Sequence, residues 1–288
     1  MTDASPQRLG RLFDPEAIRR AAAEARDTLP AAEPVEAPCP YCGGAKYGTP
    51  SVPRDHPMFG QLIRCPHCNA QADTRRDLVA LTEASLGDEA GLTLEGFNLR
   101  RRLYDVEYEG KMVSLAQQAR ALHSAHADVS ALAEKPDRWL FIYGPPGSGK
   151  THLAIGAYNA VSTQQPAAFV RASAMIGYLR DGIDDHTVDA RLEQLKTIGF
   201  LVIDDLATER PSDWGLARLY DIIDARYAAR RPTVITSNVS LLRLIPERPR
   251  QDEELHWQRI QSRIGQRLAK QTSLVVSDYR MLHLLGEG

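Results

Sequence analysis

The run from Gly144 to Thr151 has the residue types and the spacing of a loop that binds phosphate groups. It consists of Gly144, Pro145, Pro146, Gly147, Ser148, Gly149, Lys150 and Thr151. The glycines allow backbone N–H groups to surround a polyphosphate, the lysine can reach its β- and γ-phosphates, and the threonine hydroxyl can bind Mg²⁺. The run therefore predicts a site for a nucleoside triphosphate, ATP, together with Mg²⁺.

The residues on either side have the structure that such a loop needs. An apolar strand is expected at Trp139–Tyr143, before the loop, and an apolar helix at Lys150–Val161, after it. The N-terminus of a helix attracts phosphate because its backbone dipoles are aligned. We include His152, in the first turn of this helix, among the expected nucleotide-binding residues. The alternative is a chance glycine-rich turn.

An apolar segment that ends in two acids provides a second signal. Phe200–Ile203 is expected to form a strand, and Asp204 and Asp205 follow it directly. In phosphate-transferring enzymes such a strand brings a carboxylate beside Mg²⁺. We assign Asp204 to the metal and Asp205 to the attacking water. Without the glycine-rich loop, the pair would be interpreted as a solvated strand end.

Polar residues also follow a third expected strand, Thr233–Thr236. Ser237 and Asn238 come next, and we expect their strand to lie between the other two. Asn238 is the residue chosen to orient the water. The alternative is a turn or a helix cap, since Ser and Asn favour both.

The four cysteines form two C-x₂-C pairs, which suit the two halves of a tetrahedral Zn²⁺ site. The residues are Cys39, Cys42, Cys65 and Cys68. Their role would be structural, because four thiolates leave no open position on the metal. Redox chemistry is the alternative, and His56 and His67 are alternative ligands.

Composition and patterning restrict the remaining possibilities. The chain of 288 residues is 43% hydrophobic and 25% charged, with a net charge of −2, which is ordinary for a globular protein. No run has the roughly 20 apolar residues of a membrane helix and no signal peptide is evident, so we expect a cytoplasmic protein without membrane contact.

Strand-like and helix-like segments alternate beyond Pro136, and this order predicts an α/β fold with a parallel sheet covered on both faces. Further strands are expected at Ala167–Arg171 and Leu274–Val276, and helices at Pro15–Leu29, Arg76–Leu86, Lys111–Leu132, Ala174–Leu179, Val188–Lys196, Trp214–Ala229 and Asp252–Lys270. We expect three parts: an N-terminal zinc-binding domain (1–85), a linker with a leading helix (86–135) and an ATPase domain (136–288).

The segments GPPGSGKTHLA, FLVIDDL and VITSN, in this order, resemble AAA+ ATPases of the DnaC/DnaI helicase-loader and IstB transposition-helper group. The resemblance covers about residues 92–288. It implies an AAA+ P-loop NTPase core without a C-terminal lid, in which Asp205 stands where many such enzymes have Glu. It also implies that Arg263 completes the site of a neighbouring subunit and that Arg280 acts on the γ-phosphate of its own subunit. The alternative for both arginines is a solvated surface.

The same resemblance suggests what the protein does. A helicase loader would use ATP to hold a hexameric replicative DNA helicase, deliver it to single-stranded DNA and self-associate through ATP-dependent contacts. The zinc module resembles the N-terminal domains with which such loaders contact the helicase. An IstB-type transposition helper and an ATP-binding switch with very slow hydrolysis are the alternatives.

Overall fold

The computed structural model describes residues 45, 47–49, 53–54, 59–61, 63–64, 66–183, 187–208, 210–266 and 269–284. The chain divides into two compact units, Met1–Cys68 and Asn69–Gly288. In the first unit, β1 (Tyr47–Gly48) pairs antiparallel with β2 (Ile63–Arg64). The expected helix Pro15–Leu29 lies outside the described residues. The expected zinc ligands Cys39, Cys42 and Cys65 lie outside them as well, and for Cys68 only the backbone is described, within α2 (Pro66–Leu86).

The second unit is built on a five-stranded parallel sheet. Its order is β6-β7-β8-β5-β9, formed by β6 (Ala167–Arg171), β7 (Phe200–Leu206), β8 (Thr233–Ser237), β5 (Trp139–Tyr143) and β9 (Ala269–Ser273). The predicted α/β class with a parallel sheet is therefore confirmed. Because β8 lies between β5 and β7, the residues that follow these three strands meet at one edge of the sheet.

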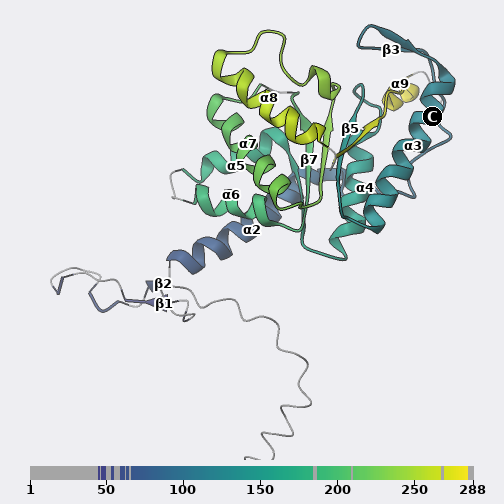
Figure 1. The fold of residues 1–288 in the computed structure, drawn as a ribbon. Coiled ribbons are helices and arrows are strands. Elements are labelled where there is room, and N and C mark those ends of the chain that lie inside the picture. Colours follow the sequence, from purple (N-terminus) through teal and green to yellow (C-terminus); the bar gives the residue numbers. More distant parts are fainter. Residues whose placement is uncertain are drawn as a thin grey trace, which may run out of the picture. The chain divides into compact units, whose positions relative to one another are not determined.

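Alternate side chains of the strands enter two separate cores. Leu201, Ile203 and Ile235 point into one core, whereas Val202 and Val234 point into the other. Helices cover both faces (Figure 1): α3 (Leu115–Glu134) and α4 (Lys150–Ser162) on one, and α5 (Ala172–Asp181), α6 (Val188–Thr197), α7 (Asp213–Ala228) and α8 (Gln251–Gly265) on the other. Burial on both faces explains why the central strands have continuous apolar runs.

The helix expected at Lys111–Leu132 is wrong at its start. Lys111–Val113 is strand β4, which pairs antiparallel with β3 (Val106–Tyr108). Glu109 and Gly110 both have positive φ angles, 49° and 78°, and form the two-residue turn of a β-hairpin. The helix α3 begins only after Ser114, whose hydroxyl accepts a hydrogen bond from the backbone N–H of Gln117.

Two expectations near the C-terminal part of the chain are also wrong. Helix α8 ends at Gly265 rather than at Lys270, and the strand expected at Leu274–Val276 is instead β9, at Ala269–Ser273. Strand β9 lies at the edge of the sheet and has exposed polar residues, so its sequence lacks an apolar run. Leu274–Val276 are buried after the strand has ended, and this burial accounts for their apolar character.

The remaining helices within the described residues are short. These are the 3-10 helices η1 (Gly87–Glu89) and η2 (Leu241–Arg243), and the helix α9 (Tyr279–Leu284). The helix expected at Arg76–Leu86 starts ten residues earlier, at Pro66 of α2. Among the helices that the structure describes, none combines the length and the apolar character needed to cross a membrane.

Candidate functional site

The loop from Gly144 to Gly149 joins β5 to α4 and depends on glycine at its two ends. A side chain at Gly144 would begin 2.1 Å from the backbone oxygen of Leu274, which leaves no room for a Cβ atom. Gly149 has a φ angle of 102°, which side-chain-bearing residues rarely adopt. The loop can therefore keep its backbone N–H groups close to the start of α4, where an anion binds well.

Lys150 is buried at the first position of α4, with 6% of its surface exposed. Its Nζ donates hydrogen bonds to the backbone oxygens of Gly144 and Pro145, each at 2.9 Å. Burial lowers the pKa of Lys150 to about 8, although Asp205 and Asp204 oppose the shift. Both of these hydrogen bonds of the ammonium group are to neutral carbonyls, so a phosphate could replace them with a stronger, charge-assisted partner.

Thr151 and Asp204 lie in contact. The Thr151 hydroxyl is 3.2 Å from Oδ1 and 3.1 Å from Oδ2 of Asp204, and Thr236 donates to Oδ1 at 2.6 Å. Burial raises the pKa of Asp204, while the hydrogen bonds from Thr236 and Thr151 lower it. A hydroxyl beside a carboxylate is a suitable pair of oxygen ligands for Mg²⁺, which retains several waters and phosphate oxygens as its other ligands.

Asp205 and Asn238 are also brought together. Asn238 Nδ2 donates to Asp205 Oδ1 at 3.0 Å and to the Thr208 hydroxyl oxygen at 2.8 Å, and that hydroxyl donates to Asp205. The backbone of Asp205 is left-handed, with a φ angle of 62°, and its N–H donates to Thr236 Oγ1 at 2.8 Å. The carboxylate is thus held by an amide and a hydroxyl that follow two neighbouring strands.

Sequence reasoning missed Thr208 and Thr236. Thr236 was expected within the strand, but its hydroxyl contacts both Asp204 and the backbone of Asp205. Thr208 reaches Asp205 because the chain turns sharply between them, where Ala207 also has a positive φ angle, 68°. No residue pattern predicts this turn, because Ala rarely adopts left-handed backbone angles.

A cavity of about 400 Å³ lies beside the phosphate-binding loop. Its lining includes Lys150, Thr151 and His152, together with Phe97, Arg101, Tyr279 and Arg280. Arg101 is buried, donates to the Ser148 backbone oxygen at 2.7 Å and lies 5.7 Å from the centre of the Tyr279 ring. Burial lowers the pKa of Arg101 to about 10. The rings of Phe97 and Tyr279 in this lining provide apolar surface of the kind on which a nucleotide base can pack.

His152 and Arg280 both reach this cavity, but each has a partner of its own. His152 Nε2 is 2.9 Å from the Thr93 backbone oxygen, and its ring meets that of Phe97 edge-on at 5.2 Å. Arg280 forms an ion pair with Asp278 at 3.2 Å, and the N–H of Tyr279 donates to the Gly147 backbone oxygen. The Asp278–Arg280 segment therefore lies directly against the loop.

Arg263 is not among the residues that line the cavity. It lies on α8, where its Nε is 2.6 Å from Asp224 Oδ1 and its guanidinium is 5.2 Å from the centre of the Tyr227 ring. The hydrogen bond that Arg263 donates to Asp224 raises the pKa of Arg263. Its action on the site of a neighbouring subunit stays a prediction.

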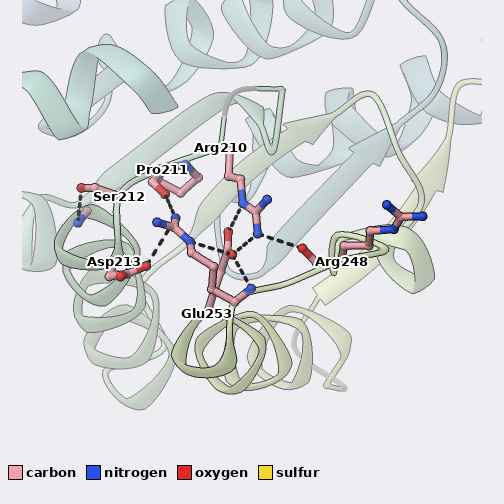
Figure 2. Close-up of polar contacts among 8 residues, drawn as sticks. Arg210, Pro211, Ser212, Asp213, Arg248 and Glu253 are labelled. Atoms are coloured by element: carbon pink, nitrogen blue, oxygen red, sulfur yellow. Dashed lines mark hydrogen bonds and ion pairs between the residues drawn. The ribbon is translucent and has the colours of Figure 1, made fainter.

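A second cluster of charges fixes the loop that follows Asp205. Figure 2 shows Arg210 pointing toward the carboxylate of Glu253, at the N-terminal end of α8. Arg250 forms an ion pair with the same buried carboxylate, at 3.3 Å. Arg210 Nε is 2.7 Å from Glu253 Oε1, and the N–H of Arg250 donates to Oε2 at 2.9 Å. The hydrogen bonds from Arg210 lower the pKa of Glu253 to about 2. The cluster joins the loop carrying Thr208 to α8.

A family model described as "IstB-like ATP binding protein" matches residues 90–255, more than half of the chain. The chain belongs to the IstB-like ATP-binding protein family. The match includes the glycine-rich loop, the acid pair and Asn238, whereas the four cysteines, Arg263 and Arg280 lie outside it.

The similarity of the chain to single known proteins is low, at 24–30% sequence identity. The chain is 26% identical over 142 residues to the phage-like element PBSX protein XkdC of Bacillus subtilis, and this covers 48% of the chain and 53% of the relative. It is 30% identical over 108 residues to a putative ATP-binding protein in an insertion sequence of Mycobacterium tuberculosis, covering 35% and 43%. It is 24% identical over 142 residues to the replicative helicase loader DnaC of Escherichia coli, covering 48% and 54%.

The chain thus spans about half the length of the curated relatives it matches. A crystal structure of the DnaC helicase loader is similar with a TM-score of 0.49 and 21% identity, covering 65% of this chain and 99% of that one.

Proposed function

We propose that this IstB-like protein is an AAA+ ATPase that loads a replicative DNA helicase onto single-stranded DNA. One observation supports hydrolysis: three groups of side chains lie together at the ends of three adjacent strands. They are Lys150, the contacting pair of Thr151 and Asp204, and the contacting pair of Asp205 and Asn238. A cation, a pair of metal ligands and a carboxylate held by an amide are the parts that phosphoryl transfer to water requires.

In this mechanism the phosphate-binding loop and Lys150 hold the triphosphate. Thr151 and Asp204 would hold Mg²⁺, which would neutralise charge on the phosphates. Asp205 accepts a proton from the attacking water, and Asn238 fixes the direction of that carboxylate. The water oxygen forms a bond to the γ-phosphorus while the bond from that phosphorus to the β,γ-bridging oxygen breaks, so that ADP and inorganic phosphate are released and Asp205 returns its proton to solvent. Arg280 would leave Asp278 for the γ-phosphate, and Arg263 would act on a neighbouring subunit that joins when ATP is bound.

Steady-state ATP hydrolysis tests the enzymatic part. Asp205→Ala should reduce turnover at least about 100-fold and leave ATP affinity within about threefold, because the carboxylate contributes mainly in the transition state. Asp181→Ala, an exposed acid on α5, is the control. Turnover by Asp205→Ala at the wild-type rate would disprove the role of Asp205. If the wild-type protein binds ATP tightly but does not hydrolyse it, the ATP-binding switch is favoured instead.

The role as a loader is supported by two kinds of observation. The relatives include the replicative helicase loader DnaC, and the four cysteines suit a Zn²⁺ site in the proposed N-terminal domain, residues 1–85. We propose that this domain binds the helicase, and that residues 86–135 connect it to the ATPase domain, residues 136–288. Zinc would supply part of the folding energy of so small a domain.

The transposition helper is the second candidate, because the relatives also include ATP-binding proteins of insertion sequences. Sedimentation of the full chain with the hexameric helicase of the same organism, with ATP, separates the two. A loader co-sediments with the helicase, transfers it to single-stranded DNA and loses binding in Cys39→Ser. A helper binds duplex DNA and a transposase instead, and failure to bind the helicase would overturn the loader.

A further inference from the structure

The β3–β4 hairpin, whose second strand replaces the start of an expected helix, touches the loop that carries Asn238. The Tyr108 hydroxyl donates to the Asn238 backbone oxygen at 3.0 Å. Glu109, at the turn, accepts hydrogen bonds from the N–H of Ser240 at 2.8 Å and from its hydroxyl at 2.9 Å. The tip of the hairpin therefore contacts the loop at two residues, Asn238 and Ser240.

The start of the same segment touches a second loop of the site. The Tyr104 hydroxyl donates to the Asp278 backbone oxygen at 3.1 Å, and the Tyr104 N–H donates to Ser277 Oγ at 3.3 Å. The buried side chain of Gln118 on α3 donates to the backbone oxygens of Tyr104 and Val113 and accepts from the N–H of Ser277. This end of the hairpin is thus joined to the segment that presents Arg280.

These contacts connect two loops that no strand of the sheet connects directly. Asn238 follows β8, whereas Asp278–Arg280 follows β9, and β5 lies between these strands. Residues 104–113 reach both loops. Neither Tyr108 nor Glu109 is among the residues that line the cavity beside Lys150, so they do not touch the nucleotide site themselves.

We propose that Tyr108 and Glu109 are positioning residues for ATP hydrolysis, which act by holding Asn238 in the orientation that directs Asp205. The proposal rests on the proposed ATPase function. Asn238 Nδ2 lies 3.0 Å from Asp205 Oδ1, so a rotation of the Asn238 backbone would move the carboxylate from the attacking water. A misplacement of this kind reduces kcat more than it weakens nucleotide binding.

Tyr108→Phe removes one hydroxyl and retains the ring that packs against Tyr143. We expect kcat to fall about fivefold to tenfold, because one hydrogen bond that positions Asn238 is lost. The KM for ATP should stay within about twofold. Glu109→Gln, which weakens the bonds to Ser240, should lower kcat in the same direction. Met112→Ala, an exposed position of the same hairpin, is the matched control.

The decisive measurement is a double-mutant cycle in single-turnover assays with enzyme in excess, supported by melting temperatures. If Tyr108 acts through Asn238, Tyr108→Phe lowers the rate in the wild type but not in Asn238→Ala. An equal loss in both backgrounds, an unchanged rate in Tyr108→Phe, or an increase of KM alone would overturn the proposal. A wild-type protein without turnover would instead overturn the ATPase function, and the positioning role with it.

Discussion

Lys150 and Glu253 are both buried and charged, but their surroundings differ. The ammonium group of Lys150 is hydrogen-bonded to the backbone carbonyls of Gly144 and Pro145, and its pKa is lowered to about 8. The carboxylate of Glu253 is bound by two arginines and by a backbone N–H, and its pKa is lowered to about 2. Burial thus opposes the charge of Lys150, whereas hydrogen bonds stabilise that of Glu253.

The difference indicates what each centre is for. A charge that is fully paired within the chain holds segments together, as Glu253 does for the loop after β7 and for α8. A buried charge with neutral partners costs folding energy that the binding of an anion can recover. Each of the following experiments alters one of the two centres, or a less buried pair for comparison.

The largest effect is expected for Lys150→Met. ATP affinity should fall at least about 100-fold, because the main cation beside the phosphates is lost. The free energy of unfolding without ATP should not decrease, because a desolvated charge is replaced by an apolar chain of similar length. Calorimetric titration and urea denaturation measure both, and Lys135→Met, with an exposed side chain, is the control. A marked loss of stability in Lys150→Met would show that this centre is structural.

Glu253→Gln should show the opposite pattern. The two arginines would lose the charge of their partner, and because both are about half exposed, we expect a loss of about 2 kcal/mol in the free energy of unfolding. ATP affinity of the folded protein should change less than about threefold. Glu254→Gln alters the neighbouring exposed residue and should be nearly neutral. Equal stability of the two variants would mean that the cluster in Figure 2 does not hold the loop.

The lowered pKa of Lys150 predicts a pH dependence of ATP binding. Above pH 8 the free protein loses the Lys150 proton, whereas the phosphates favour the protonated form, so binding takes up a proton and affinity falls as pH rises. Between pH 7 and 9 the decrease should reach about tenfold. In Lys150→Arg, the guanidinium stays charged over this range. A profile of the same slope in that variant would assign the titration to another group.

The smallest effect is expected at a partly exposed pair. Asp224→Asn removes the carboxylate that binds Arg263, and the free energy of unfolding should fall by less than about 1 kcal/mol, because solvent screens such pairs. Denaturation in low and high salt provides the measurement, and the difference from wild type should shrink in high salt. A loss as large as that of Glu253→Gln would remove the distinction between paired charges inside and outside the core.

The parts of the fold that the sequence predicted well are those governed by burial alone. Strands β5 and β6 have the expected bounds because every interior position is apolar, and the order that places β8 between β5 and β7 follows the expected meeting of three strand ends. Strand β9 was missed because this edge strand is polar at four of its five positions, and the β3–β4 hairpin because its turn depends on two backbone angles.

The same limit applies to the candidate site. The glycine-rich loop and the acid pair are contiguous in sequence, so their residue types identify them. Thr208 contributes through a left-handed turn at Asp205 and Ala207, and Tyr108 through a contact between residues 130 positions apart, so neither is visible in a local pattern. The expected action of Arg263 depends on a second subunit and so on no pattern within one chain.

The central place of β8 has a consequence for experiments in solution. Its residues Thr233–Ser237 are all buried, and both of its edges are hydrogen-bonded to neighbouring strands. Such amide protons exchange with deuterium only when the whole sheet opens, so their rates report global stability. Amides in the loop after β8 need only a local opening. One exchange experiment on β8 and its following loop thus separates the movement of Asn238 from the unfolding of the domain.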